Sequence, residues 1–414
     1  MIVRNEEKNI ENALSWAKGV VFEQIVVDTG STDRTVEIAE RMGAKIFHFE
    51  WIDDFSAAKN YAIDQASGDW IAFLDADEYI SAEHARLIIP LIEKTINLHG
   101  GKAVALTSQW AHVNDAGDTI RIDRQERFFI NHPGVRYERP IHETLKIPAG
   151  TFPVIENDLI IIHTGYAHSA YAATGKLERN IALLKKELVS NPEDIKLKYY
   201  LANDLDISGK IEEAVPLYHD VLNNAERNNI ACKWFRINAY YRLTAHLVNK
   251  TESFDEACVL AGQAFYEFPD QVNFCCLYGV ALYNRGRYEN ALDAFIKAEK
   301  LVAEGKTEGQ FVRNIDTLYI YMAQVYMKLD NPGETLRCAV SYLQSHKQHE
   351  DMLKLCMRVL RSKEIPENAV NFLSKIYDYK NIHDKMLLLR CAKDIGDIAL
   401  AQLFIKMITP EEFR

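Results

Sequence analysis

The hydrophobic pattern changes its period near residue 170, and this change requires two different folds in one chain. Before it, short β-branched or aromatic runs alternate with amphipathic stretches. This alternation predicts strands over 24–28, 45–49 and 70–74, and a helix over about 55–66. Strands and helices that alternate at this spacing indicate a largely parallel sheet covered on both faces. After the change the pattern is helical, so we expect an α/β domain followed by an all-α region.

Small residues recur at a fixed spacing in the helical part. Ala257 and Ala291 occupy equivalent places in two segments offset by 34 residues, which is the tetratricopeptide period. Small residues at such places let two antiparallel helices pack closely. We expect tetratricopeptide-like helical repeats over residues 171–345, including a degenerate copy over 317–342, and a C-terminal helical extension or cap over 346–414. A generic helical bundle is the alternative.

Composition and charge exclude several classes of function. The formal net charge of -11 argues against a general nucleic-acid binder, which needs a basic face to neutralise phosphates. No run of about 18 apolar residues occurs, so we expect no membrane span. The first residues contain no apolar stretch of signal-peptide length, and we expect a cytoplasmic protein. All seven cysteines lie in the C-terminal half without a C-x-x-C pair, which predicts reduced core thiols rather than a zinc site or disulfides.

Two carboxylates close the most apolar predicted strand. Asp75 and Asp77 follow that strand directly and are separated by one residue, and Asp28 ends another predicted strand. In sheets of this kind, ligands bind beyond the carboxyl ends of the strands. A pair of carboxylates there can share a divalent cation and hold a diphosphate through it. Unpaired carboxylates at a buried strand end are costly, which favours a cation or several hydrogen-bond donors nearby.

Four motifs follow one another in the first half of the chain. They are MIVRNEE at 1–7, VVDTGSTD at 26–33, DFSAAKN at 54–60 and DAD at 75–77. In this order they resemble the family 2 glycosyltransferases with the GT-A fold, over roughly residues 1–166. The resemblance implies a GT-A catalytic domain over residues 1–170 with a Rossmann-like mixed sheet. It also implies a UDP-sugar as donor and Mn²⁺ or Mg²⁺ as the metal.

The resemblance implies a role for each acidic residue of these motifs. Asp28 would lie by the uracil or ribose, with a turn-capping aspartate as the alternative. Asp75 would contact the ribose or the metal, and Asp77 would be a direct metal ligand. Asp33 would belong to the nucleotide site, unless it only caps a helix. His163 would be a third metal ligand or, alternatively, a histidine buried at the domain junction.

The same resemblance places Lys59 and Asn60 on the helix that faces the nucleotide. Lys59 would attract the diphosphate electrostatically, and a solvated helical lysine is the alternative reading.

A second group of residues is expected on the acceptor side. The family pattern of an arginine followed by two aromatics, a His-Glu pair and a His-x-Gly-Tyr run is present as RFF at 127–129, His142 with Glu143, and HTGY at 163–166. An inverting transfer needs one base to take the acceptor proton. Glu143 is the first candidate and His142 the second. The Glu-Asp pair that carries the commoner acid of the family is missing here, so the sequence leaves the base open.

The function implied by the resemblance is inverting transfer of a hexose or N-acetylhexosamine from a UDP-sugar. Repeat arrays offer concave surfaces to peptides, and the chain resembles the S-glycosyltransferases of glycosylated bacteriocins. We therefore expect a peptide or protein acceptor, docked partly on the helical repeats. A cell-envelope saccharide or a lipid-linked acceptor is the alternative.

Two other classes of function compete with a glycosyltransferase. One is an inactive transferase-like scaffold that binds partners through its repeats. Another is a nucleotidyltransferase, which the lack of a glycine-rich phosphate loop opposes. The apolar stretch 387–408 either caps the array or forms a homodimer contact. The first predicted strand has only three residues, so either it is short or the native chain starts upstream of Met1.

Overall fold

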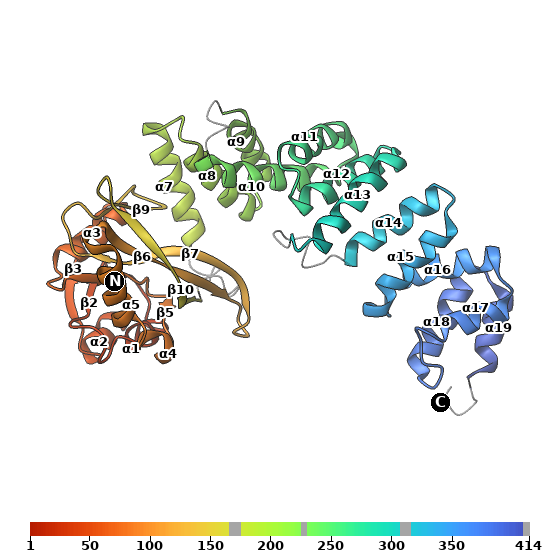
Figure 1. Cartoon of the computed structure of the whole chain (residues 1–414), viewed down its shortest axis with the longest axis horizontal. Coiled ribbons are helices and arrows are strands. Elements are labelled where there is room, and N and C mark those ends of the chain that lie inside the picture. The colour runs from red at the N-terminus through yellow and green to blue at the C-terminus, as the bar shows by residue number, and fades with distance from the viewer. Residues whose placement is uncertain (165–174, 225–229, 307–315, 409–414) are drawn as a thin grey trace. The chain divides into compact units, whose positions relative to one another are not determined.

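The structure is a computed structural model that describes residues 1–164, 175–224, 230–306 and 316–408. Its packing divides the chain into two compact units, Met1–Leu217 and Tyr218–Arg414 (Figure 1). The predicted boundary at residue 170 does not coincide with this division, because the described helices up to about residue 217 pack within the first unit.

A three-stranded parallel sheet forms the start of the first unit, in the order β1-β2-β3. Ile10 and Ile38 pack with Val26 on one face of this sheet, and Ala62 and Ile63 pack with Val27 on the other. Helices therefore cover both faces, as the alternating pattern predicts. The elements are β1 (Ile2–Val3), α1 (Ile10–Ser15), β2 (Ile25–Asp28), α2 (Thr35–Arg41), β3 (Lys45–His48) and α3 (Phe55–Asp64).

A five-stranded mixed sheet follows, in the order β4-β7-β6-β10-β5. Only β6 and β10 are parallel in it. The prediction of a largely parallel sheet therefore holds for the first sheet alone. The physical reason is the short turn at 114–118, which joins β6 to β7 and can connect only antiparallel strands. The strands are β4 (Trp70–Ala72), β5 (Glu78–Tyr79), β6 (Ala103–Val113), β7 (Thr119–Ile130) and β10 (Phe152–His163).

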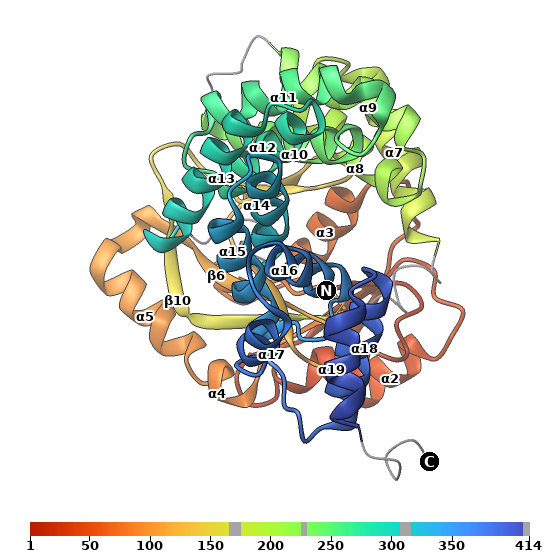
Figure 2. The ribbon, with the colours of Figure 1, turned by 90° about the vertical axis from the view of Figure 1, so that its right-hand side faces the viewer.

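Helix α5 covers the five-stranded sheet and lies alongside β10 (Figure 2). Its residues Ile88, Leu91 and Ile92 pack with Leu159 and Ile161 of β10. A separate two-stranded antiparallel ribbon, β8-β9, comes between β7 and β10 in the sequence. These elements are α4 (Ala82–Ala85), α5 (Ile88–His99), η1 (Gly100–Lys102), β8 (Arg136–Glu138) and β9 (Thr144–Lys146).

The rest of the described chain is helical. In the first unit it comprises α7 (Lys176–Ser190) and α8 (Ile195–Ile207), and α9 (Ile211–Asn223) crosses the division between the units. Within the described ranges, no helix is both long and apolar enough to cross a membrane. The second unit contains α10 (Ile230–Leu247), η2 (Thr251–Ser253), α11 (Phe254–Glu267), α12 (Val272–Asn284), α13 (Tyr288–Ala303), α14 (Asp316–Lys328), α15 (Pro332–Ser345), α16 (Glu350–Lys363), α17 (Pro366–Leu373), α18 (Ile382–Asp394) and α19 (Ile398–Lys406).

Helix pairs with small residues at their contacts build the second unit, as the repeat pattern predicts. Helix α12 packs against α13, and α14 packs against α15 (Figure 1). Ala257 and Ala291, the two residues offset by 34 positions, have no exposed surface. The predicted degenerate copy over 317–342 coincides with α14 and α15. The cysteines are buried, as expected for core thiols.

Gly279 provides the closest of these contacts, and its substitution tests the packing. A Cβ at this position would lie 2.4 Å from the ring of Phe295, which is fully buried and has no room to move. We expect Gly279→Ala to lower the free energy of unfolding by about 1–3 kcal/mol, because overpacking outweighs the helix propensity that alanine adds. Urea denaturation followed by helical circular dichroism measures this change.

Gly262→Ala is the matched control for this substitution. Gly262 also lies within a helix, but its Cβ would meet only the ring of Tyr278, at 3.3 Å, and that residue is partly exposed. We expect a change within about 1 kcal/mol. Equal losses in both variants would contradict the argument from close packing.

Candidate active site

Acidic residues gather where the strands of the first unit end. The segment that carries Asp75 and Asp77 connects β4 to β5, and β5 pairs with the end of β10 so that Glu78 lies opposite His163. The backbone N–H and the hydroxyl of Thr164 both donate to the main-chain oxygen of Asp77, each at 3.0 Å. The strand pairing therefore holds the Asp-x-Asp segment against His163.

Two cations neutralise Asp75. Lys59 Nζ lies 3.1 Å from its Oδ1, and Arg127 Nη2 lies 2.7 Å from its Oδ2. Arg127 comes from β7, and its main-chain oxygen accepts the N–H of Phe73, just after β4. Although burial alone would raise the pKa of Asp75, the guanidinium and ammonium groups hold it well below its usual range. Asp75 is therefore a structural ion-pair partner in this state, with both oxygens engaged.

Arg127 also pairs with Glu78, whose side chain is fully buried. Burial raises the pKa of Glu78 to about 7, with Asp75 and Asp77 acting in the same direction and Arg127 against it.

Lys59 connects Asp75 to Glu143. Its Nζ lies 2.5 Å from Glu143 Oε1, and only 3% of its surface is exposed. The alternative of a solvated helical lysine is therefore wrong, because α3 points this side chain into the domain. The two carboxylates raise the pKa of Lys59 against the opposing effect of burial. Glu143, the first candidate for the base, thus joins the same charged cluster as Asp75.

Two neighbouring histidine rings form a series of contacts that ends at Asp77. His163 Nε2 lies 3.7 Å from Asp77 Oδ2, and the Nδ1 atoms of His163 and His112 are 2.9 Å apart. His112 Nε2 in turn lies 3.0 Å from Asp123 Oδ2. The register that pairs His163 of β10 with His112 of β6 builds this chain. It orients the His163 ring toward Asp77, as the outer hydrogen-bond partners of metal-binding histidines do.

Helix α7, which lies beyond the α/β domain in the sequence, brings one more cation to the site. Lys176, at the start of α7, lies 3.8 Å from Asp77 Oδ2 and 3.5 Å from Glu6 Oε1. Its side chain keeps 33% of its surface exposed, so a ligand can reach it. The expected run at 163–166 reaches the described residues only through Thr164, because Gly165 and Tyr166 lie outside them.

The two aspartates of the second motif organise a turn and a helix start. Asp28, which is buried, accepts from the N–H groups of Gly30 at 3.2 Å and Ser31 at 3.0 Å. This is the turn-capping contact that the sequence offered as the alternative to a nucleotide-binding role. Asp33 accepts from the N–H of Thr35 at 2.9 Å, and hydrogen bonds lower its pKa against the effect of burial. The structure thus gives both residues a local partner, and their nucleotide contacts stay predictions.

Two other predicted residues point elsewhere. Asn60 donates to the main-chain oxygen of Tyr137 and accepts from its N–H, both at 2.9 Å, so its amide joins α3 to β8. His142 stacks on Tyr200 of α8, with ring centroids 3.6 Å apart and planes 9° apart. Burial lowers the pKa of His142 to about 4. A buried imidazole that is stacked on a helix is poorly placed as a base, so the geometry favours Glu143 over His142.

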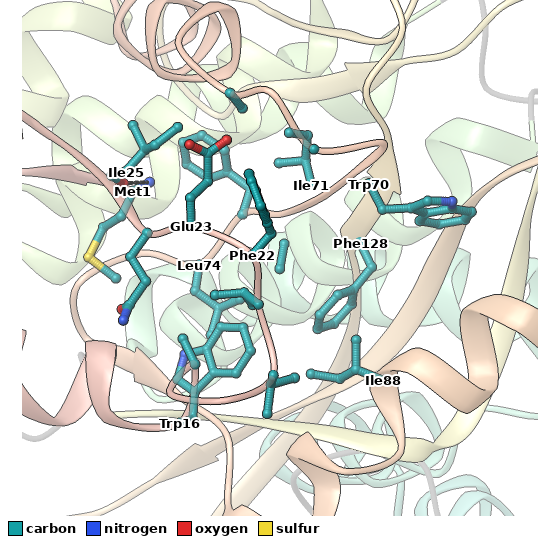
Figure 3. Close-up of a pocket in the computed structure, with 18 of the residues that line it drawn as sticks. Met1, Trp16, Phe22, Glu23, Ile25, Trp70, Ile71, Leu74, Ile88 and Phe128 are labelled. Carbon is teal, nitrogen blue, oxygen red and sulfur yellow. Dashed lines mark hydrogen bonds between the residues drawn. The ribbon is translucent and has the colours of Figure 1, made fainter. Parts of the chain in front are cut away.

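A cavity of about 340 Å³ lies elsewhere in the domain (Figure 3). Its lining is mostly apolar and includes Ile25, which begins β2, and Trp70, which begins β4. It therefore lies at the amino ends of these strands, whereas Asp28 and Asp75 lie at the carboxyl ends. The cavity and the charged cluster are separate features, and the cluster is the one that brings several carboxylates and cations together.

The fit of a divalent cation can be judged from the donor atoms. Asp77 and His163 offer an oxygen and a nitrogen that face one another, a donor pair that Mn²⁺ and Mg²⁺ sites accept. The three predicted ligands are not gathered as one set, since Asp75 is ion-paired. Across the described ranges no group of three His, Cys, Asp or Glu side chains is arranged to hold a metal. Asp77 and His163 are therefore the two residues placed to hold a cation, and a bound cation stays a prediction.

Several residues of this site were missed by reasoning from the sequence. His112 and Asp123 lie on neighbouring strands, and no spacing rule connects them with position 163. Lys176 follows the family motifs and looks like any other helical lysine. Among the residues that the sequence motifs did not assign, Glu78 alone carried a sequence signal, because it directly follows the Asp-x-Asp run.

Comparisons with known proteins agree with this fold. Residues 1–149 match the model of Glycosyl transferase family 2. The chain is 36% identical over 228 residues to a TPR repeat-containing protein of Synechococcus elongatus, covering 52% of this chain and 53% of that protein. It is 30% identical over 234 residues to the SPbeta prophage-derived glycosyltransferase SunS of Bacillus subtilis, covering 55% and 54%. The chain thus spans about half the length of these curated relatives.

These observations define the class of the protein. Its N-terminal part is a family 2 glycosyltransferase domain, and a tetratricopeptide-like helical region follows. The resemblance read from the four motifs is thereby confirmed for the catalytic domain.

Substitution of Lys59 tests the charged cluster. Lys59→Met leaves Glu143, which is mostly covered, without its cation, and breaking a buried ion pair from one side costs up to about 3–5 kcal/mol. We expect the free energy of unfolding of the first unit to fall by that amount in urea denaturation. Lys185→Met is the control, because Lys185 pairs with Glu213 at 3.3 Å on the surface and exposed pairs contribute about 0–1 kcal/mol. Similar losses in both variants would contradict a buried cluster.

Proposed function

We propose that this chain is an inverting, metal-dependent glycosyltransferase that moves a hexose or N-acetylhexosamine from a UDP-sugar to an acceptor. The observation that carries the proposal is the placement of Asp77 between His163 and Lys176 at the end of the strands. The match of residues 1–149 to a glycosyltransferase family supports it.

Each residue of the site has a task in this proposal. Asp77 and His163 would hold the cation, which when bound stabilises the negative charge of the leaving diphosphate. Lys176 stands beside Asp77 with an exposed ammonium group and would pair with the same diphosphate. Lys59 and Arg127 are buried and already neutralised by carboxylates, so they set the position of Asp75 and Glu143 rather than bind the donor.

The bond changes follow from inversion. The acceptor nucleophile attacks the anomeric carbon from the face opposite to the diphosphate, and the bond from that carbon to the UDP oxygen breaks. UDP leaves with the bonding electron pair. Glu143 would take the proton of the nucleophile, since it belongs to the charged cluster, is not a candidate metal ligand and, unlike Glu78, keeps part of its side chain exposed.

The proposed acceptor is a peptide or protein. Its support is the helical region, because arrays of helix pairs offer an extended surface to peptides. One of the relatives is named a TPR repeat-containing protein, and the match to it covers about half of each chain. Transfer to a saccharide or lipid-linked acceptor, with no transfer to any peptide, would overturn this part of the proposal alone.

Release of UDP from a panel of UDP-sugars tests the activity. We expect slow hydrolysis of one donor with Mn²⁺ or Mg²⁺ and none with EDTA. Asp77→Ala should lower the rate at least about 100-fold, because several kcal/mol of charge stabilisation are lost. Glu93→Ala, which removes an exposed carboxylate of α5, is the control and should keep the wild-type rate. A wild type that neither releases nor binds UDP with any donor would support the inactive scaffold instead.

A further inference from the structure

The segment Arg139–Glu143, here called the β8–β9 loop, contains two strained residues. Arg139 has a φ of 83° and His142 a φ of 52°, in the left-handed region that residues with a side chain rarely adopt. Such conformations are strained and persist only where the surroundings hold them. The loop therefore needs strong contacts on both sides, and it ends at the carboxylate that pairs with Lys59.

Helix α8 supplies the contacts on one side. Arg139 Nη2 lies 2.7 Å from Asp194 Oδ2, and Oδ1 of the same aspartate caps α8 by accepting from the N–H of Lys196 at 2.9 Å. His142 stacks on Tyr200, about 1.7 turns beyond Asp194 along the helix, with the ring planes 9° apart. Both strained residues are thus held by side chains of α8.

Helix α3 supplies the contacts on the other side. The N–H of Phe55 donates to the main-chain oxygen of Pro140 at 2.8 Å, and the hydroxyl of Ser56 donates to that of Arg139 at 2.5 Å. Glu143 then reaches Lys59 of the same helix. The loop is therefore fixed between α3, which carries a residue of the charged cluster, and α8, which lies outside the family-matched residues 1–149.

We propose that Tyr200 of α8 and its N-cap Asp194 are positioning residues for Glu143, and that this helix of the helical region completes the catalytic unit. This inference rests on the proposed function of Glu143 as the base. Tyr200 fixes the loop by stacking on His142, so an aromatic ring is required there. Asp194 fixes the loop by charge, so its carboxylate is required in addition to its helix cap.

Variants of Tyr200 in the full chain test this role, with UDP release from the donor that the wild type hydrolyses as the assay. We expect Tyr200→Ala to lower kcat about 10- to 100-fold, because a small displacement of a reacting group has effects of this size. The KM for the donor and the Kd for UDP with Mn²⁺ should stay within about 2-fold, because Asp77, His163 and Lys176 are untouched. Tyr200→Phe should restore the wild-type kcat.

Asp194→Asn keeps the cap acceptor and removes the charge, so it tests the loop without loss of the helix start. We expect a lower kcat with unchanged UDP binding, whereas Glu193→Ala, a neighbouring exposed carboxylate, should leave kcat unchanged. A wild-type kcat in Tyr200→Ala or in Asp194→Asn overturns the proposal, and so does a Tyr200→Phe variant as slow as Tyr200→Ala. If Tyr200→Ala fails to fold, Asp194→Asn decides. Failure of the proposed function is recognised separately, as a wild type without UDP release.

Discussion

The site of the first unit depends on one buried lysine. Lys59 lies between Asp75 and Glu143 with almost no exposed surface, and Arg127 plays the matching part between Asp75 and Glu78. Burying this many carboxylates without cations would be prohibitive, because each uncompensated charge costs several kcal/mol. The two cations therefore allow acidic side chains to stand at the end of buried strands. Asp77 is left beside His163 and the exposed Lys176, where a ligand can reach it.

The five-stranded sheet determines which side chains meet around Asp77. Because β10 pairs with β5 on one side and with β6 on the other, His163 lies opposite both Glu78 and His112. The β6–β7 hairpin then brings Asp123 to the far nitrogen of His112. An ordered series of side chains thus runs across three strands and ends at the aspartate that we propose as a metal ligand. Sheet register, rather than any loop, controls the orientation of His163.

Helices α7 and α8 pack within the first unit, with the α/β domain. Lys176 of α7 reaches the Asp-x-Asp segment, and α8 holds the strained loop that carries Glu143. A boundary drawn where the strand pattern ends would separate these groups from the site that they complete. In our proposals the helical region therefore has two different roles. Helices α7 and α8 contribute residues to the active site, and the later repeats offer a surface for the acceptor.

The sequence by itself determined the strand–helix alternation, the Asp-x-Asp segment and the 34-residue offset of Ala257 and Ala291, because these features are local or depend on the order of motifs. It also brought Lys59 and Glu143 into consideration through the family resemblance. Only the tertiary structure decided that Lys59 is buried, that Asn60 joins α3 to β8 and that His142 stacks on α8. Those contacts connect residues about 60 to 80 positions apart, as with Asn60 and Tyr137 at 77 positions. Neither hydrophobic period nor motif spacing carries information about such pairings, which depend on sheet register and helix packing.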